Sequence, residues 1–188
     1  MSYYLALLLV IATVASLPAA VVERMTLEDL VARSPIIAHA RVERTSAAWD
    51  DLTGVIWTHS ELILQEGLKG RPGNLIQVSE PGGVVGDVGQ SVEGMPRFIP
   101  GEEVVVFLYR TPQGLWRVRG LGQGKFTFLR NAPNSDPVVR SNLAGLTVAE
   151  SGHLTPLSST TNTVNGMAFN DFKATVRALV DKGSHAKR

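Results

Sequence analysis

The side chains that come nearest to a metal-binding or catalytic set are two histidines and a glutamate. His39 and His59 lie in two neighbouring stretches of alternating apolar and polar residues, and Glu61 follows His59 by two positions. Because alternate side chains of a strand share a face, we expect all three on the outward faces of adjacent strands. Two imidazoles and a carboxylate would suffice to bind zinc. The spacing matches no zinc motif, so we predict solvated surface residues with no metal and no other cofactor.

Two further motifs can be compared with catalytic templates. The stretch GLGQGK at 120–125 places glycine amides before Lys125, as an anion-binding loop would. It lacks the spacing of nucleotide-binding motifs and no helical pattern follows it, so we predict a glycine bend between strands. Ser151 and His153 lie in an irregular segment, and no nucleophile-elbow sequence occurs. We therefore predict that the chain is not an enzyme; the alternative is an unrecognised hydrolase or metal-dependent site.

A run of basic residues between positions 110 and 130, free of acidic residues, is the first candidate binding surface. Its members are Arg110, Arg117, Arg119, Lys125 and Arg130. In LWRVRG, strand alternation turns Arg117 and Arg119 away from Trp116 and Val118. One interpretation is a solvated basic face over an ordinary core. The other is a face of Arg117, Arg119 and Lys125 that binds an anionic polymer by charge alone, because the aromatic side chains face the core.

The second candidate surface is a glycine-dense loop over residues 81–100. Glycines recur too often there for regular strands, because each loses conformational entropy inside a strand. The apolar side chains of the loop are Val84, Val85, Val88, Met95 and Phe98. Long loops on rigid scaffolds often carry binding residues, so we predict that these side chains are exposed and contact a protein. The alternative is that Val84, Phe98 and their neighbours fold back to plug one end of a barrel.

A helix and several short strands must position these candidates. TLEDLVARSP predicts a helix that Thr26 and Asp29 cap and Pro35 ends. Residues 44–54 are predicted to turn the chain between two strands. The predicted strands cover 36–43, 55–67 or 55–70, 75–80, 102–109, 115–120 and 125–130. EEVVVFLY is apolar on both sides of the pleat, as expected for the strand buried most deeply.

The amino terminus predicts export. Residues 1–20 are uncharged and almost wholly apolar to Val14, with small Ala19 and Ala20 at the end. This pattern is typical of a secretory signal peptide, and an uncleaved membrane anchor or a buried helix are the alternatives. The formal net charge of +1 gives no chain-wide attraction to nucleic acid or anionic membranes, and we predict no nucleic-acid partner. The chain has no cysteine, which excludes disulfides, thiolate metal sites and cysteine nucleophiles.

The carboxy-terminal third changes character. Residues 131–168 are rich in Ser, Thr, Asn, Pro and Gly, which favours loops or a tethered segment. FNDFKATVRALVDKG then predicts a helix capped by Asn170 or Asp171. Its apolar face comprises Phe172, Val176, Leu179 and Val180. A short helix is marginal alone, so we expect this face to dock on the barrel, with another protein as the alternative partner.

The order of five motifs resembles a known group of barrels. EDLVARSPIIAHARVER, THSELILQEGLKG, IQVSEPGG, FIPGEEVVVFLY and LGQGKFTF follow one another. At Ile36 to Val42, Leu62 to Gly70 and Gly101 to Phe107 they are similar to the netrin-module and tissue-inhibitor-of-metalloproteinases group of OB-fold barrels. The signatures PGG…G…FxxGEEVVxFL and GxGQGKF also resemble those of uncharacterised secreted bacterial proteins, over residues 25–130.

The resemblance implies a barrel that presents loops to a protein or polyanionic ligand. The inhibitors themselves place an amino-terminal cysteine, held by disulfides, on the protease zinc. That mechanism cannot apply to a chain without cysteine.

The sequence thus predicts a mainly β protein, a small OB-like β-barrel with an amino-terminal and a carboxy-terminal helix. The expected organisation is a signal peptide (1–20), the barrel with its leading helix (21–130), an irregular segment (131–168) and the terminal helix (169–182). The expected function is that of a secreted or periplasmic, non-enzymatic module that binds an extracytoplasmic protein through barrel loops. An anionic polymer is the alternative partner, and no stable membrane span is expected once the signal is cleaved.

Overall fold

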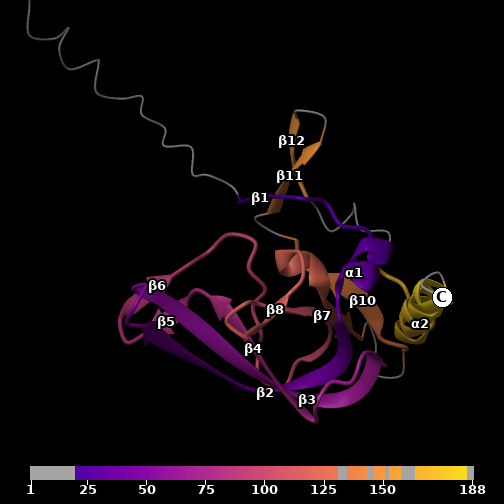
Figure 1. Cartoon of the computed structure of the whole chain (residues 1–188), viewed down its shortest axis with the longest axis horizontal. Coiled ribbons are helices and arrows are strands. Elements are labelled where there is room, and N and C mark those ends of the chain that lie inside the picture. Colours follow the sequence, from indigo (N-terminus) through magenta and orange to yellow (C-terminus); the bar gives the residue numbers. More distant parts are fainter. Residues whose placement is uncertain (1–19, 131–134, 144–145, 151–152, 158–163, 186–188) are drawn as a thin grey trace, which may run out of the picture.

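The computed structural model describes residues 20–130, 135–143, 146–150, 153–157 and 164–185 (Figure 1). In chain order the elements are β1 (Ala20–Val22), α1 (Leu27–Arg33), β2 (Ile36–Asp50), β3 (Val55–Lys69), β4 (Leu75–Pro81), β5 (Gly83–Val85), β6 (Val88–Gln90), β7 (Glu103–Arg110), β8 (Trp116–Val118), the 3₁₀ turn η1 (Leu121–Gly124), β9 (Lys125–Leu129), β10 (Val138–Ser141), β11 (Leu146–Glu150), β12 (His153–Pro156) and α2 (Phe169–His185). The predicted signal peptide lies outside the described residues, apart from Ala20 in β1.

The first helix forms as its cap residues predict. The Thr26 hydroxyl accepts the Asp29 backbone N–H, and the Asp29 carboxylate accepts the Thr26 backbone N–H. This reciprocal capping box satisfies two amide groups that the first turn of a helix leaves without partners. The helix ends at Arg33, and Ser34, immediately before Pro35, is its C-cap. Leu30 and Val31 are its buried residues, so α1 is held by an apolar face as well as by its cap.

Five strands form a partly closed ring. Each is hydrogen-bonded to the next in the order β7, β2, β3, β4, β8 and back to β7. The pairs are antiparallel except β4 with β8, which run parallel and are joined at a single residue pair, Val78 with Trp116. Strands β9 and β10 extend the sheet beyond β7. The predicted mainly β fold with an amino-terminal and a carboxy-terminal helix is confirmed, and the sheet is a partly closed ring.

The strand β7 separates two apolar clusters, one inside the ring and one outside it. Val104, Val106 and Leu108 lie in the inner cluster, whereas Val105 and Phe107 lie in the outer one. All five are fully buried. The prediction that EEVVVFLY is buried on both sides is therefore confirmed, and the reason is that a second layer covers the outside of the ring.

That second layer consists of α1 and α2. Phe172 and Val176 are fully buried in the outer cluster, and Leu179 and Val180 pack against it. The predicted docking of the terminal helix on the ring is confirmed (Figure 1). The helix begins at Phe169, so the two predicted cap residues lie inside its first turn instead of preceding it. It ends at His185, three residues beyond the predicted boundary.

The prediction of a turn over residues 44–54 is wrong for most of that stretch. Strand β2 continues to Asp50 and pairs with β3 as far as Val55, so the two strands extend beyond the ring as a ribbon. Only the residues between Asp50 and Val55 turn. The Asp50 carboxylate accepts the Leu52 N–H and the Thr53 hydroxyl, and Gly54 adopts a positive φ of 64°. The polar, small residues of 44–48 suit an exposed ribbon as well as a loop, which is why composition misled here.

Two segments predicted to be irregular contain strands. The loop over 81–100 includes the hairpin of β5 and β6, which lies against the β2–β3 ribbon. The described parts of 131–168 include β10, which pairs with β9, and β11 with β12, which form a three-stranded sheet with β1. In Figure 1 this small sheet projects from the body beside α1. Within the described residues, no helix has the length and apolar character needed to cross a membrane.

Candidate functional site

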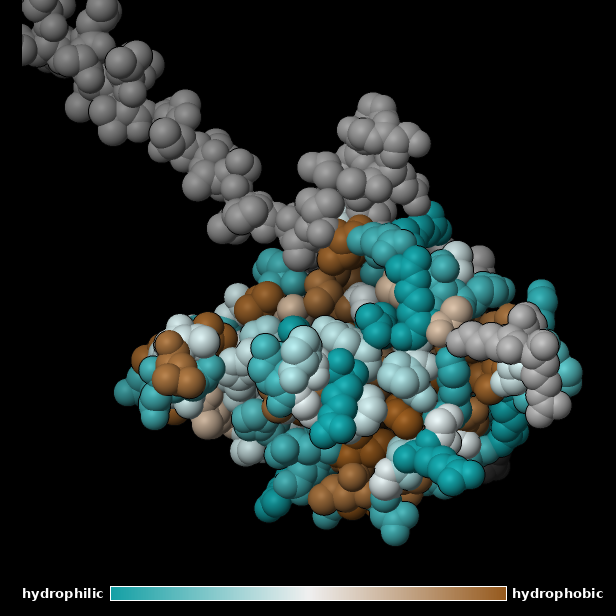
Figure 2. Space-filling model, viewed as in Figure 1, coloured by the Kyte–Doolittle hydropathy of each residue, from teal (hydrophilic) through white to brown (hydrophobic). Residues whose placement is uncertain are grey.

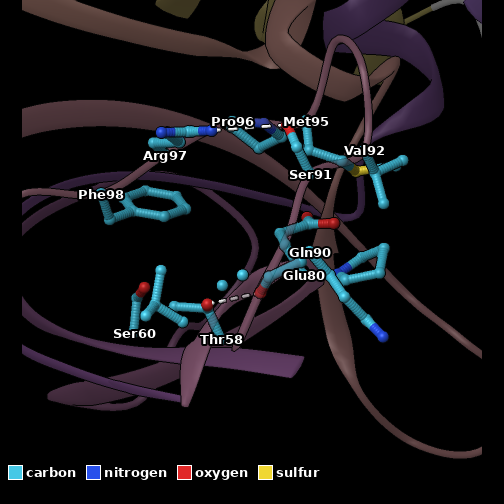
Figure 3. A pocket seen from close by; sticks show the side chains of 15 residues that line it. Thr58, Ser60, Glu80, Gln90, Ser91, Val92, Met95, Pro96, Arg97 and Phe98 are labelled. Carbon is cyan, nitrogen blue, oxygen red and sulfur yellow. Dashed lines mark hydrogen bonds between the residues drawn. The ribbon is translucent and has the colours of Figure 1, made fainter. Parts of the chain in front are cut away.

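A pocket of about 360 Å³ opens where the hairpin of β5 and β6 meets one end of the ring (Figure 3). Strands β3 and β4 provide its polar wall, with Thr58, Ser60 and Glu80. The hairpin and the segment that follows it provide the opposite wall. The remaining lining residues are Pro81, Gly82, Gly83, Val84, Gly89, Gln90, Ser91, Val92, Met95, Pro96, Arg97 and Phe98. The pocket therefore combines hydroxyl and amide groups with apolar side chains.

Glu80 is the buried acid of this pocket, and its carboxylate closes the weak seam of the ring. One oxygen accepts the Val118 backbone N–H at 2.7 Å, and the other accepts two N–H groups of Arg117 at 2.9 and 3.0 Å. Beyond Val78 and Trp116 no further residue pair joins β4 to β8. The carboxylate thus replaces a backbone acceptor where the two strands separate. Burial raises the pKa of Glu80, and the Arg117 guanidinium and the Val118 N–H oppose this effect.

Two side-chain hydrogen bonds between the ring and the β5–β6 hairpin hold the hairpin in place. The Thr58 hydroxyl donates to the Gly82 carbonyl at 2.6 Å, and Gln90 Oε1 accepts the Ile56 N–H at 2.7 Å. Gly83 has a φ of 142°, and a Cβ there would lie 2.5 Å from the Thr58 hydroxyl. Only glycine fits this close approach. The hairpin is therefore a fixed part of the ring's end and presents its side chains from a rigid base.

The structure divides the five predicted contact residues between surface and core. Val84 and Val88 are exposed, by 68% and 48% respectively. Val85 and Met95 are half-buried. Phe98 is buried in the inner cluster of the ring, so the prediction that it is exposed is wrong. The alternative prediction, that Val84 and Phe98 fold back to plug the ring, is confirmed for Phe98 and wrong for Val84.

The three predicted polyanion-binding residues do not form a free basic face. Arg117 is paired with Glu80, and its guanidinium lies over the Trp57 ring. Lys125 is buried and bonds both oxygens of Glu102 at 2.7 and 2.9 Å. Burial lowers the pKa of Lys125, while Glu102 opposes that shift. Acidic partners that lie far away in the sequence therefore neutralise two of the three charges.

The third residue, Arg119, stacks on Tyr109 at 4.1 Å and leaves its Nε buried without a hydrogen bond. Burial lowers the pKa of Arg119. Arg97 is the basic residue of the pocket lining. Its side chain is exposed at the rim, and its guanidinium lies 3.5 Å from the Ser91 hydroxyl. Arg117 and Lys125 thus pair with carboxylates within the fold, and Arg119 packs on an aromatic ring.

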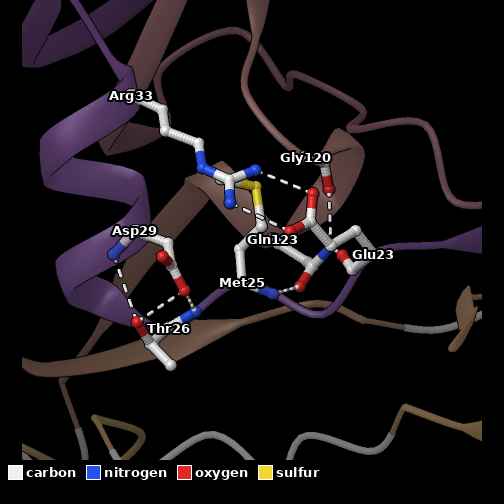
Figure 4. A network of polar contacts seen from close by, with 7 residues as sticks. All are labelled: Glu23, Met25, Thr26, Asp29, Arg33, Gly120 and Gln123. Atoms are coloured by element: carbon white, nitrogen blue, oxygen red, sulfur yellow. Dashed lines mark hydrogen bonds and ion pairs between the residues drawn. The ribbon is translucent and has the colours of Figure 1, made fainter. Parts of the chain in front are cut away.

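The glycine motif at 120–125 is a packing junction, as its predicted role as a bend implies (Figure 4). Gln123 accepts the Met25 N–H and donates to the carbonyls of Glu23 and Gly120. Glycine is required at position 124, because a Cβ there would lie 2.3 Å from the Arg119 carbonyl oxygen. The motif fastens the amino-terminal segment to η1.

The histidines and Glu61 are not brought together. His39 is buried, not solvated as predicted, because Phe169 of α2 covers it and its Nε2 lies 2.6 Å from Glu103 Oε1. His59 bonds the Ser79 hydroxyl, and Glu61 pairs with Arg44. Among the described residues no group of three or more His, Asp or Glu side chains is placed to hold a metal ion. Of the Ser151 and His153 pair, Ser151 lies outside the described residues, and His153 is the first residue of β12.

No protein-family model matches this chain, and no curated protein matches it. The case for a function rests on the geometry of the pocket and its rim. Sequence reasoning did not identify Thr58, Glu80 or Gln90 as site residues. The sequence did contain one signal for Glu80: it is a carboxylate at an inward-facing position of the strand IQVSE, immediately before PGG.

Proposed function

We propose that this protein is an exported, non-enzymatic binding module that recognises an extracytoplasmic protein through the β5–β6 hairpin and the pocket behind it. One observation carries the proposal. Val84 and Val88 are exposed apolar side chains on a hairpin that the ring holds rigidly, and Val84 also lines the mouth of the pocket. Apolar side chains of this kind gain free energy when a partner covers them.

The surroundings of the two valines favour a protein partner. The space-filling view shows hydrophobic surface at the end of the molecule where β5 and β6 lie (Figure 2). A preformed, apolar projection beside a cavity is the arrangement in which a few anchor side chains supply most of a protein interface's binding energy. The polar groups of the cavity wall would then accept hydrogen bonds from, or donate them to, the entering segment of the partner.

The rigidity of the hairpin supports the same proposal. Thr58, Gln90 and the two hydrogen bonds that they make fix the hairpin before any partner arrives. A surface that is already ordered loses little conformational entropy on binding. The netrin-type resemblance adds the expectation that loops at one end of the ring meet a protein ligand. The apolar amino terminus adds the expectation of export, and export would place the partner outside the cytoplasm.

A site-specific cross-linking experiment tests the proposal. A photoreactive amino acid placed at Val84 in the exported protein should cross-link to a specific extracytoplasmic protein. The same amino acid placed at Ile63 is the matched control, because Ile63 is exposed on the outer face of β3. Cross-linking of one protein from Val84 and not from Ile63 is expected. Equal labelling from both positions, or none from either, would contradict recognition through the hairpin.

A further inference from the structure

Among the described residues, no strand pairs with the outer edge of the β2–β3 ribbon. Strand β2 pairs with β7 only from Ile36 to Arg41, and the Val42 N–H then bonds the Glu102 carbonyl. From Arg44 to Asp50 the described residues place no backbone hydrogen bond on this side of β2. Such an edge is a template for a further strand, and proteins usually cover or interrupt it.

The residues that present free backbone groups can be identified. On β3, Ile56 and Leu64 bond toward β4, through the Gly82 N–H and the Asn74 carbonyl. Because bonding alternates along a strand, Trp57 and His59 bond toward β2, where they face Ala48 and Ser46. The residues of β2 that alternate with these direct their backbone N–H and C=O groups toward the open edge. They are Thr45, Ala47 and Trp49.

These three residues are complementary to a second copy of themselves. In an antiparallel pairing that places Ala47 opposite Ala47 of the second copy, Thr45 faces Trp49 and all three outward residues exchange hydrogen bonds. A shift of the register by two residues leaves one of the three without a partner. The edge thus has one register that satisfies all its backbone groups.

The side chains on the other face fit the same register. Arg44, which pairs with Glu61 in its own chain, lies opposite Asp50 of the second copy, whose carboxylate also accepts the Leu52 N–H and the Thr53 hydroxyl. The two-fold symmetry repeats this pair of opposite charges at the other end. Between them the small side chains of Ser46 and Ala48 face one another. Opposite charges directly across two strands stabilise their pairing, and like charges would oppose it.

Two unusually exposed side chains lie where this pairing would cover them. Leu52, in the turn after β2, is 96% exposed, and Ile99 is 65% exposed. The turn that carries Ile99 joins the ring beside Val42, through the Gly101 N–H and the Val42 carbonyl. In the register above, Leu52 of the second copy is level with Val42. Leu52 and Ile99 would then meet twice in a symmetric pair.

We propose that two copies of this chain associate through the outer edges of β2, forming one continuous antiparallel sheet with two-fold symmetry. An interface of this kind is isologous and closes on itself, so assembly stops at the dimer. The inference is independent of the partner proposed above, because the hairpin of β5 and β6 lies on the face of the ribbon and not on this edge.

Single cysteines test the register, since the chain has none of its own. In the proposed dimer, Ala47 faces its own copy at a Cα separation of about 5.5 Å, within the range that a disulfide spans. Ala47→Cys should therefore give a covalent dimer under mild oxidation. Ser46→Cys is the matched control, because Ser46 faces Ala48 of the second copy. Equal cross-linking of both variants, or of neither, would overturn the register.

Charge variants test the dimer without any covalent bond. By sedimentation, Ser46→Lys with Ala48→Lys should raise the dimer dissociation constant roughly ten-fold through like charges across the strands, whereas Ser46→Glu with Ala48→Lys should not. Ile63→Lys with Leu75→Lys carries the same net charge as the first pair on another exposed surface and should leave the constant unchanged. A parent protein that stays monomeric at all concentrations, or that responds equally to all three pairs, would contradict the proposal.

Discussion

At the scale of single residues, buried polar side chains complete what the backbone leaves unfinished. Glu80 accepts hydrogen bonds from Val118 and Arg117 where β4 and β8 separate. Gln123 of η1 holds the amino-terminal segment by two hydrogen bonds, one from the Met25 N–H and one to the Glu23 carbonyl. Each acts between segments that lie far apart in the sequence. Glu80 thus acts as a joint of the ring, and Gln123 as a joint between the amino-terminal segment and η1.

Removal of the Glu80 carboxylate should open the seam of the ring. Glu80→Ala leaves the buried Val118 N–H and the Arg117 guanidinium without an acceptor, so the free energy of unfolding should fall by about 3 kcal/mol. Chemical denaturation measures this. Glu61→Ala is the matched control, because its ion pair with Arg44 is exposed, and it should change stability little. Equal losses in the two variants would show that Glu80 is not a joint.

At the scale of elements, α2 turns an outward-facing surface of the ring into a core. His39 was expected on a solvated face because its strand alternates, and alternation correctly gives the outward direction. It cannot reveal that a helix more than a hundred residues later covers that face. The same limit applies to Arg117 and Lys125, whose acidic partners come from other strands. Local patterns thus predicted both helices and six of the twelve described strands, β7 among them, but not which surfaces stay exposed.

The covered His39 should make the docking of α2 sensitive to acid. Burial lowers the pKa of His39. The nearby charge of Lys173 lowers it further, whereas Glu103 opposes the shift. The unfolded chain therefore takes up this proton more readily than the folded one. The stability that neutral His39 permits is complete above its unfolded pKa of about 6.5 and declines as the pH falls from there toward the folded pKa.

Denaturation at several pH values measures this decline. We expect a lower free energy of unfolding at pH 5.5 than at pH 7.5, and a smaller difference between the two in His39→Gln. Glu103 and the other histidines remain in the variant, so the comparison isolates His39. An unchanged pH dependence in His39→Gln would contradict the role assigned to its burial.

At the scale of the whole molecule, the described residues form a partly closed ring with a hairpin fixed at one end and an open sheet edge. Composition and periodicity were sufficient for the mainly β class and for the helix near each end. The ribbon and the hairpin were missed, because small polar residues and glycines suit exposed strands and loops equally well. The candidate contact surface was found in outline from Val84 and Val88. The cavity behind it was not predicted, because Thr58 and Glu80 come together only when β3 pairs with β4.

Export can be tested on the intact chain. In a bacterial host the protein with its own leader should appear in the periplasm or medium with a new amino terminus near Val21. The apolar stretch to Val14 and the small residues before Val21 are the reason. Amino-terminal sequencing of the fractionated protein gives the answer, and a version that begins at Val21 should remain in the cytosol. Full-length protein retained in the cytosol would contradict export.

Recognition through the hairpin is the central claim, and the affinity of matched variants for the cross-linked partner tests it most directly. Val84→Asp and Val88→Asp should weaken binding at least roughly ten-fold, because each places a carboxylate in an apolar contact. Their melting temperatures should stay near that of the parent, since both side chains are exposed, and Ile63→Asp should change neither quantity. Unchanged affinity in both hairpin variants, or affinity that falls only in step with melting temperature, would contradict the claim.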